Sequence, residues 1–282
     1  MTQEMATEAL QRESRYVHAN GIDIHYVEAG QGEPLLLLDN AMVSTSPIWA
    51  ALPFAYAAFM ATLAGHFRVI APDARGSGKS VHSGGPIPYT LLADDVAALI
   101  GELNLDRPLV CGFSDGGETA TILGIRHPGS VRAIVNHAGY DLFNPDPDAP
   151  ATVITRQMLG GSPDATQADP ELSASRSGEL RAMFELMKSD HDRAQGAGHW
   201  KAVIAQTFDR ITRPHGYCLD DVHTITASTL IITGDRDPFC TVEEGAAAYR
   251  ALRAGEFAVL PNTGHLITPA AVQTVIDFFE RL

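Results

Sequence analysis

The chain has few cysteines, no long apolar run and a shortage of basic residues. Its 282 residues contain 3 cysteines, and 20 Lys and Arg stand against 34 Asp and Glu, giving a formal net charge of −14. Cys111, Cys218 and Cys240 form neither a Cys-x-x-Cys pair nor an even framework, which predicts a reducing, cytoplasmic location without structural zinc. The acidic excess argues against nucleic acids and anionic membranes as partners, and leaves oligomeric state open.

Targeting and membrane signals are also scarce. The longest apolar stretch, 50–64, is too short to cross a bilayer and contains Pro53, so it predicts a packed helix. The polar segment 1–15 lacks the apolar core of a signal peptide and is expected to fray. No internal repeat is apparent. Length and composition therefore favour one large α/β domain with room for an insertion.

Short apolar runs alternate with helical patterns in two parts of the chain. The predicted strands are 16–28 (a hairpin turning at Asn20-Gly21), 35–38, 68–71, 109–112, 131–136, 229–233 and 256–260. The predicted helices of these parts are 47–64, 89–103, 116–126, 242–252 and 269–282. This alternation predicts an α/β fold with an eight-stranded, mostly parallel sheet and helices on both faces.

The middle of the chain has a different pattern. Residues 141–150 are rich in proline and aspartate, which marks a boundary, and strand-like runs disappear from 151 to 223. Helices are expected near 152–159, 178–190 and 200–211. We therefore predict that residues 1–140 and 224–282 form the core, and that 141–223 form a helical cap insertion.

A Gly-x-Ser-x-Gly motif centred on Ser114 follows one of the predicted strands. Small flanking residues allow a strained strand-to-helix turn that exposes the serine hydroxyl. Such a hydroxyl needs a histidine base, itself oriented by a carboxylate. His265 follows strand 256–260, and Asp235 and Asp237 follow strand 229–233. Asp237 is the preferred acid because it lies further from the strand, where a loop can aim it at the histidine.

The order serine, acid, histidine is that of α/β hydrolases. Residues 73–80, Asp-Ala-Arg-Gly-Ser-Gly-Lys-Ser, also match the D-x-R-G-x-G-x-S loop of that superfamily. Over most of its length the chain resembles an α/β-hydrolase-fold serine hydrolase. The resemblance implies Ser114 as nucleophile, His265 as base and Asp237 as its partner, with neither cofactor nor metal. Serine at this position distinguishes the chain from haloalkane dehalogenases and epoxide hydrolases, which carry aspartate there.

The resemblance also implies an oxyanion hole made of two backbone N–H groups. One is expected from Asp115, directly after the nucleophile. The second is expected from the loop after strand 35–38, where many relatives carry His-Gly and this chain has Asp39-Asn40. Position alone nominates Ala41 or Asn40 as this donor.

The residues that face the substrate are less sharply indicated. The carboxylate of Asp115 either attracts a cationic substrate, as the Ser-Asp-Gly-Gly resemblance to valacyclovir-hydrolase-like members suggests, or caps the following helix. Substrate-binding candidates are Asp115, Trp49, Phe113 and Trp200. A set of aromatic and methionine side chains is expected either to line an acyl pocket or only to pack the cap. They are Trp49, Phe54, Tyr56, Phe59, Met183, Phe184, Met187 and Trp200. Histidines interpreted as surface residues, with no metal-ligand spacing, are His191, His199, His215 and His223.

These features predict a serine hydrolase that cleaves a small-molecule substrate, a carboxylic ester or lactone. Three alternatives stay open. The first is another reaction on the same triad: hydrolysis of a carbon–carbon bond or of a thioester, or a lyase or cyclase step. A receptor of the same fold binds a ligand without turnover. A catalytically inactive interaction module is the third, because fold alone does not assign function.

Overall fold

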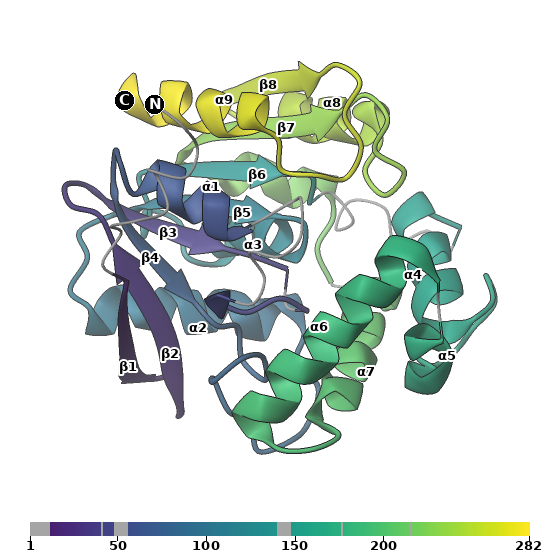
Figure 1. The fold of residues 1–282 in the computed structure, drawn as a ribbon. Helices are drawn as coiled ribbons and strands as arrows, with labels where there is room; N and C mark the ends of the chain where they lie inside the picture. Colours follow the sequence, from purple (N-terminus) through teal and green to yellow (C-terminus); the bar gives the residue numbers. More distant parts are fainter. Residues whose placement is uncertain (1–11, 41, 48–55, 140–147, 176, 215) are drawn as a thin grey trace, which may run out of the picture.

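The computed structural model describes residues 12–282 except 41, 48–55, 140–147, 176 and 215 (Figure 1). At its centre is an eight-stranded sheet in the order β1-β2-β4-β3-β5-β6-β7-β8. The strands are β1 (Glu13–Ala19), β2 (Ile22–Ala29), β3 (Pro34–Leu38), β4 (Arg68–Pro72), β5 (Leu109–Phe113), β6 (Ala133–His137), β7 (Ser228–Gly234) and β8 (Gly255–Leu260). β2 is antiparallel to both of its neighbours, and the pairs from β4 to β8 are parallel. The predicted α/β fold is confirmed.

The antiparallel pair begins with the turn that the sequence indicates. Ala19 pairs with Ile22, so Asn20 and Gly21 alone connect β1 to β2. Their φ angles are 45° and 76°, and two consecutive positive φ values are what a type I′ hairpin turn requires. Asparagine and glycine adopt these angles at low cost, which explains why this dipeptide fixes the hairpin.

Helices cover both faces of the sheet. Successive side chains of its central strands point alternately to one face and to the other, and pack against the helices there. Leu35 and Leu37 of β3 pack in one apolar layer, whereas Leu36 and Leu38 pack in the other. The first layer contains α1 (Tyr56–Leu63) and α9 (Pro269–Glu280), and the second contains α2 (Tyr89–Glu102) and α3 (Asp115–Arg126). α8 (Val242–Ala251) packs against β7. Burial on both faces explains why these strands are continuous apolar runs.

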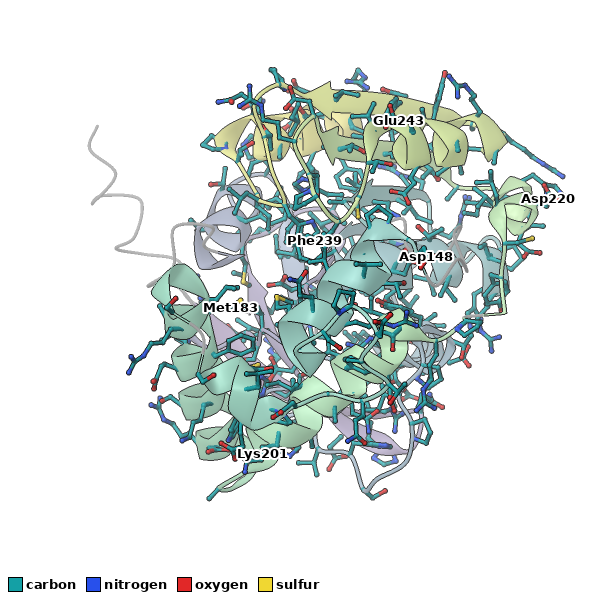
Figure 2. The ribbon with its side chains drawn as sticks, turned by 90° about the vertical axis from the view of Figure 1, so that its right-hand side faces the viewer. Asp148, Met183, Lys201, Asp220, Phe239 and Glu243 are labelled. Carbon is teal, nitrogen blue, oxygen red and sulfur yellow. The ribbon has the colours of Figure 1, made fainter. Side chains whose placement is uncertain are left out.

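Between β6 and β7 the chain forms only helices among its described residues. They are α4 (Pro150–Gly160), α5 (Pro170–Ala174), α6 (Gly178–Gln195), α7 (His199–Thr212) and the 3-10 helix η3 (Leu219–Thr224). We call residues 150–212 the helical segment. It lies on the side of the sheet where the parallel strands end, and in Figure 2 Phe239 lies above the helices that carry Met183 and Lys201. Its core contains Phe184, Trp200 and Phe208, together with Met42 from the loop after β3.

Candidate active site

Ser114 sits at a tight turn between β5 and α3. Its φ of 54° is unusual for a residue other than glycine, and it is the residue directly before the first turn of α3. A Cβ atom on Gly112 would lie 2.1 Å from the backbone oxygen of Gly116, and a Cβ on Gly116 would lie 2.1 Å from that of Leu38. Only glycine fits at these two positions, so the motif reflects the close approach of β5, α3 and β3.

His265 joins Ser114 to Asp237. The hydroxyl of Ser114 lies 3.0 Å from Nε2 of His265, and Nδ1 of the same ring lies 2.9 Å from Oδ2 of Asp237. With its proton on Nδ1, the imidazole donates to the carboxylate and accepts from the serine hydroxyl. We call these three residues the Ser114 array. Its members come from the ends of β5, β7 and β8, where a parallel sheet collects its loops.

The two aspartates after β7 have different partners. Oδ1 of Asp237 accepts the N–H groups of Phe239 and Cys240 at 2.9 and 3.1 Å, which leaves Oδ2 for His265. Asp235 instead accepts the N–H of Thr263 at 3.0 Å. Hydrogen bonds from the backbone of Asn262 and Thr263 lower the pKa of Asp235. The structure thus places Asp237 against the imidazole, while Asp235 shapes the loop that carries it.

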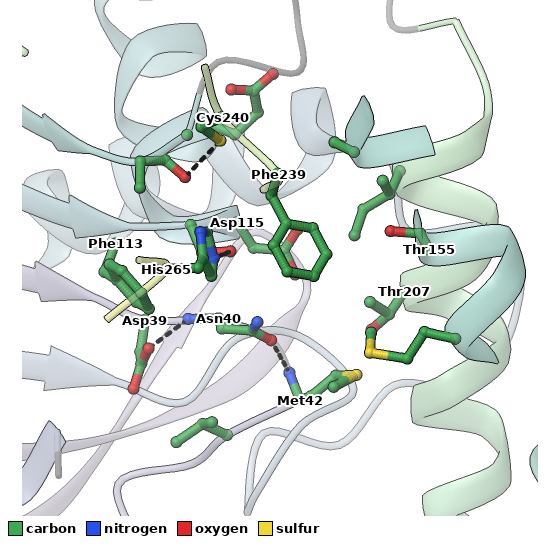
Figure 3. Close-up of a pocket in the computed structure, with 18 of the residues that line it drawn as sticks. Asp39, Asn40, Met42, Phe113, Asp115, Thr155, Thr207, Phe239, Cys240 and His265 are labelled. Carbon is green, nitrogen blue, oxygen red and sulfur yellow. Dashed lines mark hydrogen bonds between the residues drawn. The ribbon is translucent and has the colours of Figure 1, made fainter. Parts of the chain in front are cut away.

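A cavity of about 260 Å³ opens onto Ser114 and His265 (Figure 3). Phe113 and Phe239 contribute aromatic surface beside the serine. The opposite wall comes from the helical segment and includes Met158, Met183 and Met187. This apolar lining suits a small uncharged group attached to the carbonyl that the serine would attack.

Several predicted pocket residues lie elsewhere. Trp200 does not line this cavity, because it is buried inside the core of the helical segment, where Lys188 and Lys201 lie over its ring. Phe184 is buried in the same core, and Phe59 packs under the sheet. The side chains of Trp49, Phe54 and Tyr56 lie outside the described residues.

The predicted oxyanion donors have different environments. Asp115 is the first residue of α3, so its N–H lies at the positive end of the helix dipole. The N–H of Asn40 is already engaged, since it donates to Oδ1 of Asp39 at 2.7 Å. The Asn40 side chain accepts the N–H of Met42 at 2.8 Å, which folds this loop back on itself. Asn40 is therefore a poor donor as the loop stands, and Ala41 lies outside the described residues.

The Asp115 carboxylate forms a buried ion pair. Its Oδ2 accepts from Nη2 of Arg210 at 3.0 Å, and its Oδ1 accepts the hydroxyl of Tyr89. The side chains of Arg210 and Asp115 are each only 2% exposed. From the sequence, the Asp115 carboxylate was expected to attract a cationic substrate or to cap the helix; neither alternative included the ion pair with Arg210. Arg210 belongs to α7, so the ion pair ties the helical segment to the residue after Ser114.

Two titratable side chains near the Ser114 array have shifted pKa values. The pKa of Asp39 is raised to about 8, chiefly by burial and also by the nearby Asp115, against the opposing hydrogen bond from the Asn40 backbone. Its Oδ2 is shut off from solvent and accepts no hydrogen bond from the described residues. Burial, together with His265, lowers the pKa of His137 to about 3. Near neutral pH we therefore expect a neutral carboxyl and a neutral imidazole here.

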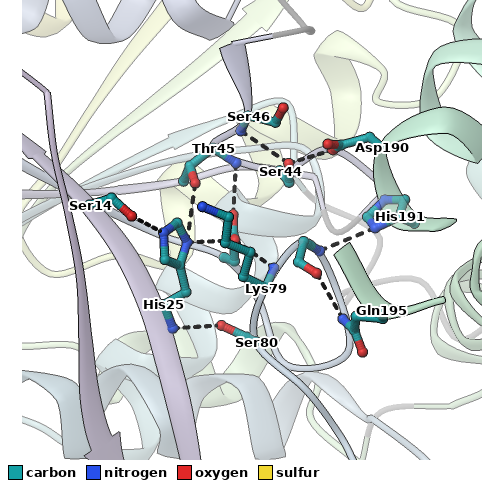
Figure 4. A network of polar contacts seen from close by, with 12 residues as sticks. Ser14, His25, Ser44, Thr45, Ser46, Lys79, Ser80, Asp190, His191 and Gln195 are labelled. Carbon is teal, nitrogen blue, oxygen red and sulfur yellow. Dashed lines mark hydrogen bonds and ion pairs between the residues drawn. The ribbon is translucent and has the colours of Figure 1, made fainter. Parts of the chain in front are cut away.

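A second Ser–His–Asp arrangement is carried by β1, β2 and the loop after β4, which lie at the end of the sheet order away from β8 (Figure 4). The hydroxyl of Ser14 is 2.8 Å from Nε2 of His25, and Nδ1 of that ring is 2.7 Å from Oδ2 of Asp73. We call it the Ser14 array. Burial would raise the pKa of Asp73, but hydrogen bonds from His25 and from the N–H groups of Lys79 and Thr45 lower it below its usual value. The sequence analysis missed this arrangement, because His25 lies in a strand and outside any reactive-loop motif.

Histidines of the helical segment anchor it to the core. His191 is fully buried; it accepts the N–H of Gly78 at 3.1 Å and donates to the carbonyl of Met42 at 3.1 Å. His199 donates to the carbonyl of Gly76 at 2.8 Å. The prediction that these are surface histidines is wrong for His191, whereas His199 is half-buried. His223 is exposed, as predicted, and His215 lies outside the described residues.

A profile of the alpha/beta hydrolase family matches residues 35–278. The chain belongs to the alpha/beta hydrolase family. Its match to 3-oxoadipate enol-lactonase 2 of Acinetobacter baylyi is 27% identical over 232 residues, 80% of each chain. Its match to haloalkane dehalogenase 2 of Mycobacterium tuberculosis is 33% identical but covers only 44% of this chain and 41% of the relative.

Solved structures of other hydrolases share this fold. A meta-cleavage product hydrolase from Pseudomonas fluorescens superposes with a TM-score of 0.71 at 17% identity, covering 95% of this chain and 97% of the other. The enol-lactonase from Burkholderia xenovorans gives 0.70 at 23% identity, covering 94% and 100%. At these identities the solved structures show a shared fold. Among the residues that the structure describes, no helix has the length and apolar character needed to cross a membrane.

Proposed function

We propose that this family member is a serine hydrolase that cleaves a small carboxylic ester or lactone through an acyl-enzyme. The observation that carries the proposal is the setting of the Ser114 array: the serine lies 3.0 Å from the imidazole, occupies a positive-φ turn before a helix and opens onto the cavity. An imidazole held by a buried carboxylate can accept the serine proton and stabilise the charge that results. The match to an enol-lactonase over 80% of both chains supports a lactone or ester as substrate.

In this mechanism the Ser114 oxygen attacks the carbonyl carbon while Nε2 of His265 takes its proton. Asp237 stabilises the imidazolium, and the N–H of Asp115 donates to the developing oxyanion. His265 then protonates the leaving alcohol oxygen, and an acyl-enzyme remains. A water molecule, deprotonated by His265, releases the acid and restores the serine.

The second oxyanion donor is expected from the loop after β3. With the Asn40 N–H engaged by Asp39, Ala41 is the better candidate of the two. Losing one such donor typically costs about 10²–10³ in rate, so this loop sets much of the activity.

A fluorophosphonate probe followed by mass spectrometry tests the nucleophile. We expect a label on Ser114, none in Ser114→Ala and strongly reduced labelling in His265→Ala. Ser14→Ala is the matched control, because the Ser14 array has similar distances, and it should label like the parent chain. Label on any other serine would overturn the assignment.

The products of turnover in ¹⁸O-labelled water separate hydrolysis from its alternatives. Hydrolysis of a p-nitrophenyl ester or aryl lactone places one labelled oxygen in the released acid. A lyase or cyclase reaction on the same residues forms product without that label. Binding without turnover of any ester or lactone would favour a receptor.

A further inference from the structure

A thiol lies beside the imidazole and carboxylate of the Ser114 array. One donor atom from each of Cys240, His265 and Asp237 lies within 4.8 Å of the other two. Cys240 and Asp237 are buried, His265 is partly buried, and the cavity is lined by Cys240 and His265. Sulfur, imidazole nitrogen and carboxylate oxygen are the donor types that Zn²⁺ takes in proteins.

The spacing is close to that of a tetrahedral site. With Zn–S of about 2.3 Å and Zn–N of about 2.0 Å, two ligands of one zinc ion lie about 3.5 Å apart. Nδ1 of His265 and Oδ2 of Asp237 are 2.9 Å apart, so these two must separate slightly. The Cys240 thiol must give up its hydrogen bond to the Ala138 carbonyl, at 3.1 Å, and turn toward them.

We propose that Cys240, His265 and Asp237 form an inhibitory site for Zn²⁺ and similar thiophilic divalent cations. The metal takes the Cys240 sulfur, Nδ1 of His265 and a carboxylate oxygen of Asp237, with water from the cavity as fourth ligand. A thiolate and a carboxylate balance the two positive charges, so the loaded site is neutral. Because the charges balance, the free-energy cost of burying the ion in the low-dielectric interior is reduced.

Inhibition follows from the proton balance. The thiol releases its proton to solvent when it binds the metal. The imidazole proton on Nδ1 moves to Nε2, since the metal now occupies Nδ1. Nε2 then carries a hydrogen and can no longer accept the Ser114 proton. The consequence for turnover rests on the proposed hydrolase function, whereas metal binding itself does not.

Calorimetric titration of the full chain with Zn²⁺ tests binding without any substrate. We expect one zinc ion per chain, and a Cys240→Ala variant should bind at least about 100-fold more weakly because it loses the thiolate ligand. Cys218→Ala is the matched control, since Cys218 is exposed and outside this cluster, and should bind like the parent chain. Cys240→Ser, with nearly unchanged volume, repeats the test if the alanine variant fails to fold.

Two further readouts identify the ligands. Co²⁺ in place of Zn²⁺ should produce the near-ultraviolet charge-transfer absorption of a cobalt–thiolate bond, absent in Cys240→Ala. Below the thiol pKa, zinc affinity should rise about tenfold per pH unit, because one proton leaves on binding. Equal zinc affinity in the parent chain and Cys240→Ala, or no cobalt–thiolate band, would overturn the site. Binding without inhibition of ester hydrolysis would instead count against the role of His265.

Discussion

The molecule carries two Ser–His–Asp arrays of nearly equal geometry in very different surroundings. The Ser114 array has distances of 3.0 and 2.9 Å, and the Ser14 array has 2.8 and 2.7 Å. Ser114 occupies a positive-φ turn before a helix and opens onto a cavity. Ser14 lies exposed in the regular edge strand β1. Distances within a triad therefore do not distinguish a candidate active site from a structural hydrogen-bond network.

The two carboxylates show what separates the arrays. Asp73 accepts N–H groups from Thr45 and Lys79, so it fastens the loop after β4 to the loop after β3. Among the described residues, the backbone N–H groups that Asp237 accepts come from its own loop, from Phe239 and Cys240. The first arrangement holds distant segments together, whereas the second holds one side chain in place for the imidazole. We therefore expect the Ser14 array to stabilise the fold, and the proposed chemistry to belong to the Ser114 array.

The largest contrast is expected from the two serines. Ser114→Ala should lower kcat for ester hydrolysis by about 10⁴–10⁶-fold, because the nucleophile is lost. Ser14→Ala should change kcat less than about twofold, since exposed substitutions rarely disturb a distant site. Steady-state assays with a p-nitrophenyl ester check both. Comparable losses in the two variants would break the distinction.

The two aspartates should separate activity from stability. Asp237→Asn should lower kcat by about 10⁴-fold, because the imidazole loses the carboxylate that sets its tautomer. Asp73→Asn should leave kcat largely intact but reduce the free energy of unfolding by about 2–4 kcal/mol, because it removes buried charge-assisted hydrogen bonds. Urea unfolding at neutral pH, run beside the kinetic assay, measures both effects.

The pH dependence of Asp73→Asn gives the sign of this effect. The native pKa of Asp73 is lowered, so its ionised form stabilises the fold at pH values above the pKa of the unfolded chain, which is about 3.9. That stabilisation is lost as pH falls through the native pKa. The difference between parent and variant should shrink below about pH 4; a constant difference would contradict the assignment.

The ion pair next to Ser114 is expected to contribute to stability. Arg210→Met leaves the Asp115 carboxylate buried without its cation, which typically costs about 3–5 kcal/mol. Arg213→Met is the matched control, because Arg213 is exposed and pairs with Asp209 on the surface of the same helix. It should change stability by less than about 0.5 kcal/mol. Chemical unfolding of both variants measures the contrast, and equal losses would show that the Asp115 pair is not special.

The last contrast concerns Asp39, whose pKa shift is opposite in sign to that of Asp73. Its native pKa is raised to about 8, so its protonated form favours folding, and this stability is lost as pH rises from about 4 to about 8. Asp39→Asn should therefore gain stability relative to the parent as pH rises from about 4 to about 8, and the difference should level off above that. Melting temperatures across this range check the trend, and parallel curves would contradict a raised pKa.

Sequence reasoning identified the features that depend on local backbone requirements. Asn20-Gly21 predicted the hairpin, and the glycines around Ser114 predicted the turn before α3, because few other residues fit these positions. It also preferred Asp237 to Asp235, and the structure places Asp237 against His265. The catalytic roles themselves stay predictions.

Long-range contacts and short helices were not predictable in the same way. The partner of Asp115 is 95 residues away in the sequence, so no motif links it to Arg210. The engagement of the Asn40 N–H by Asp39 depends on a side-chain rotation that spacing does not encode. Helix α5 (Pro170–Ala174) is too short to show a helical period.

The methionine wall of the cavity has a consequence for substrate breadth. Met158, Met183 and Met187 reach the cavity through unbranched thioether chains, which adopt many shapes at little energetic cost. Such a wall adapts its contour to acyl groups of different outline while the backbone of the helical segment stays fixed. Selectivity should therefore change gradually when these positions are varied. Mild peroxide treatment, which converts thioethers to polar sulfoxides, should weaken the binding of apolar substrates to this wall.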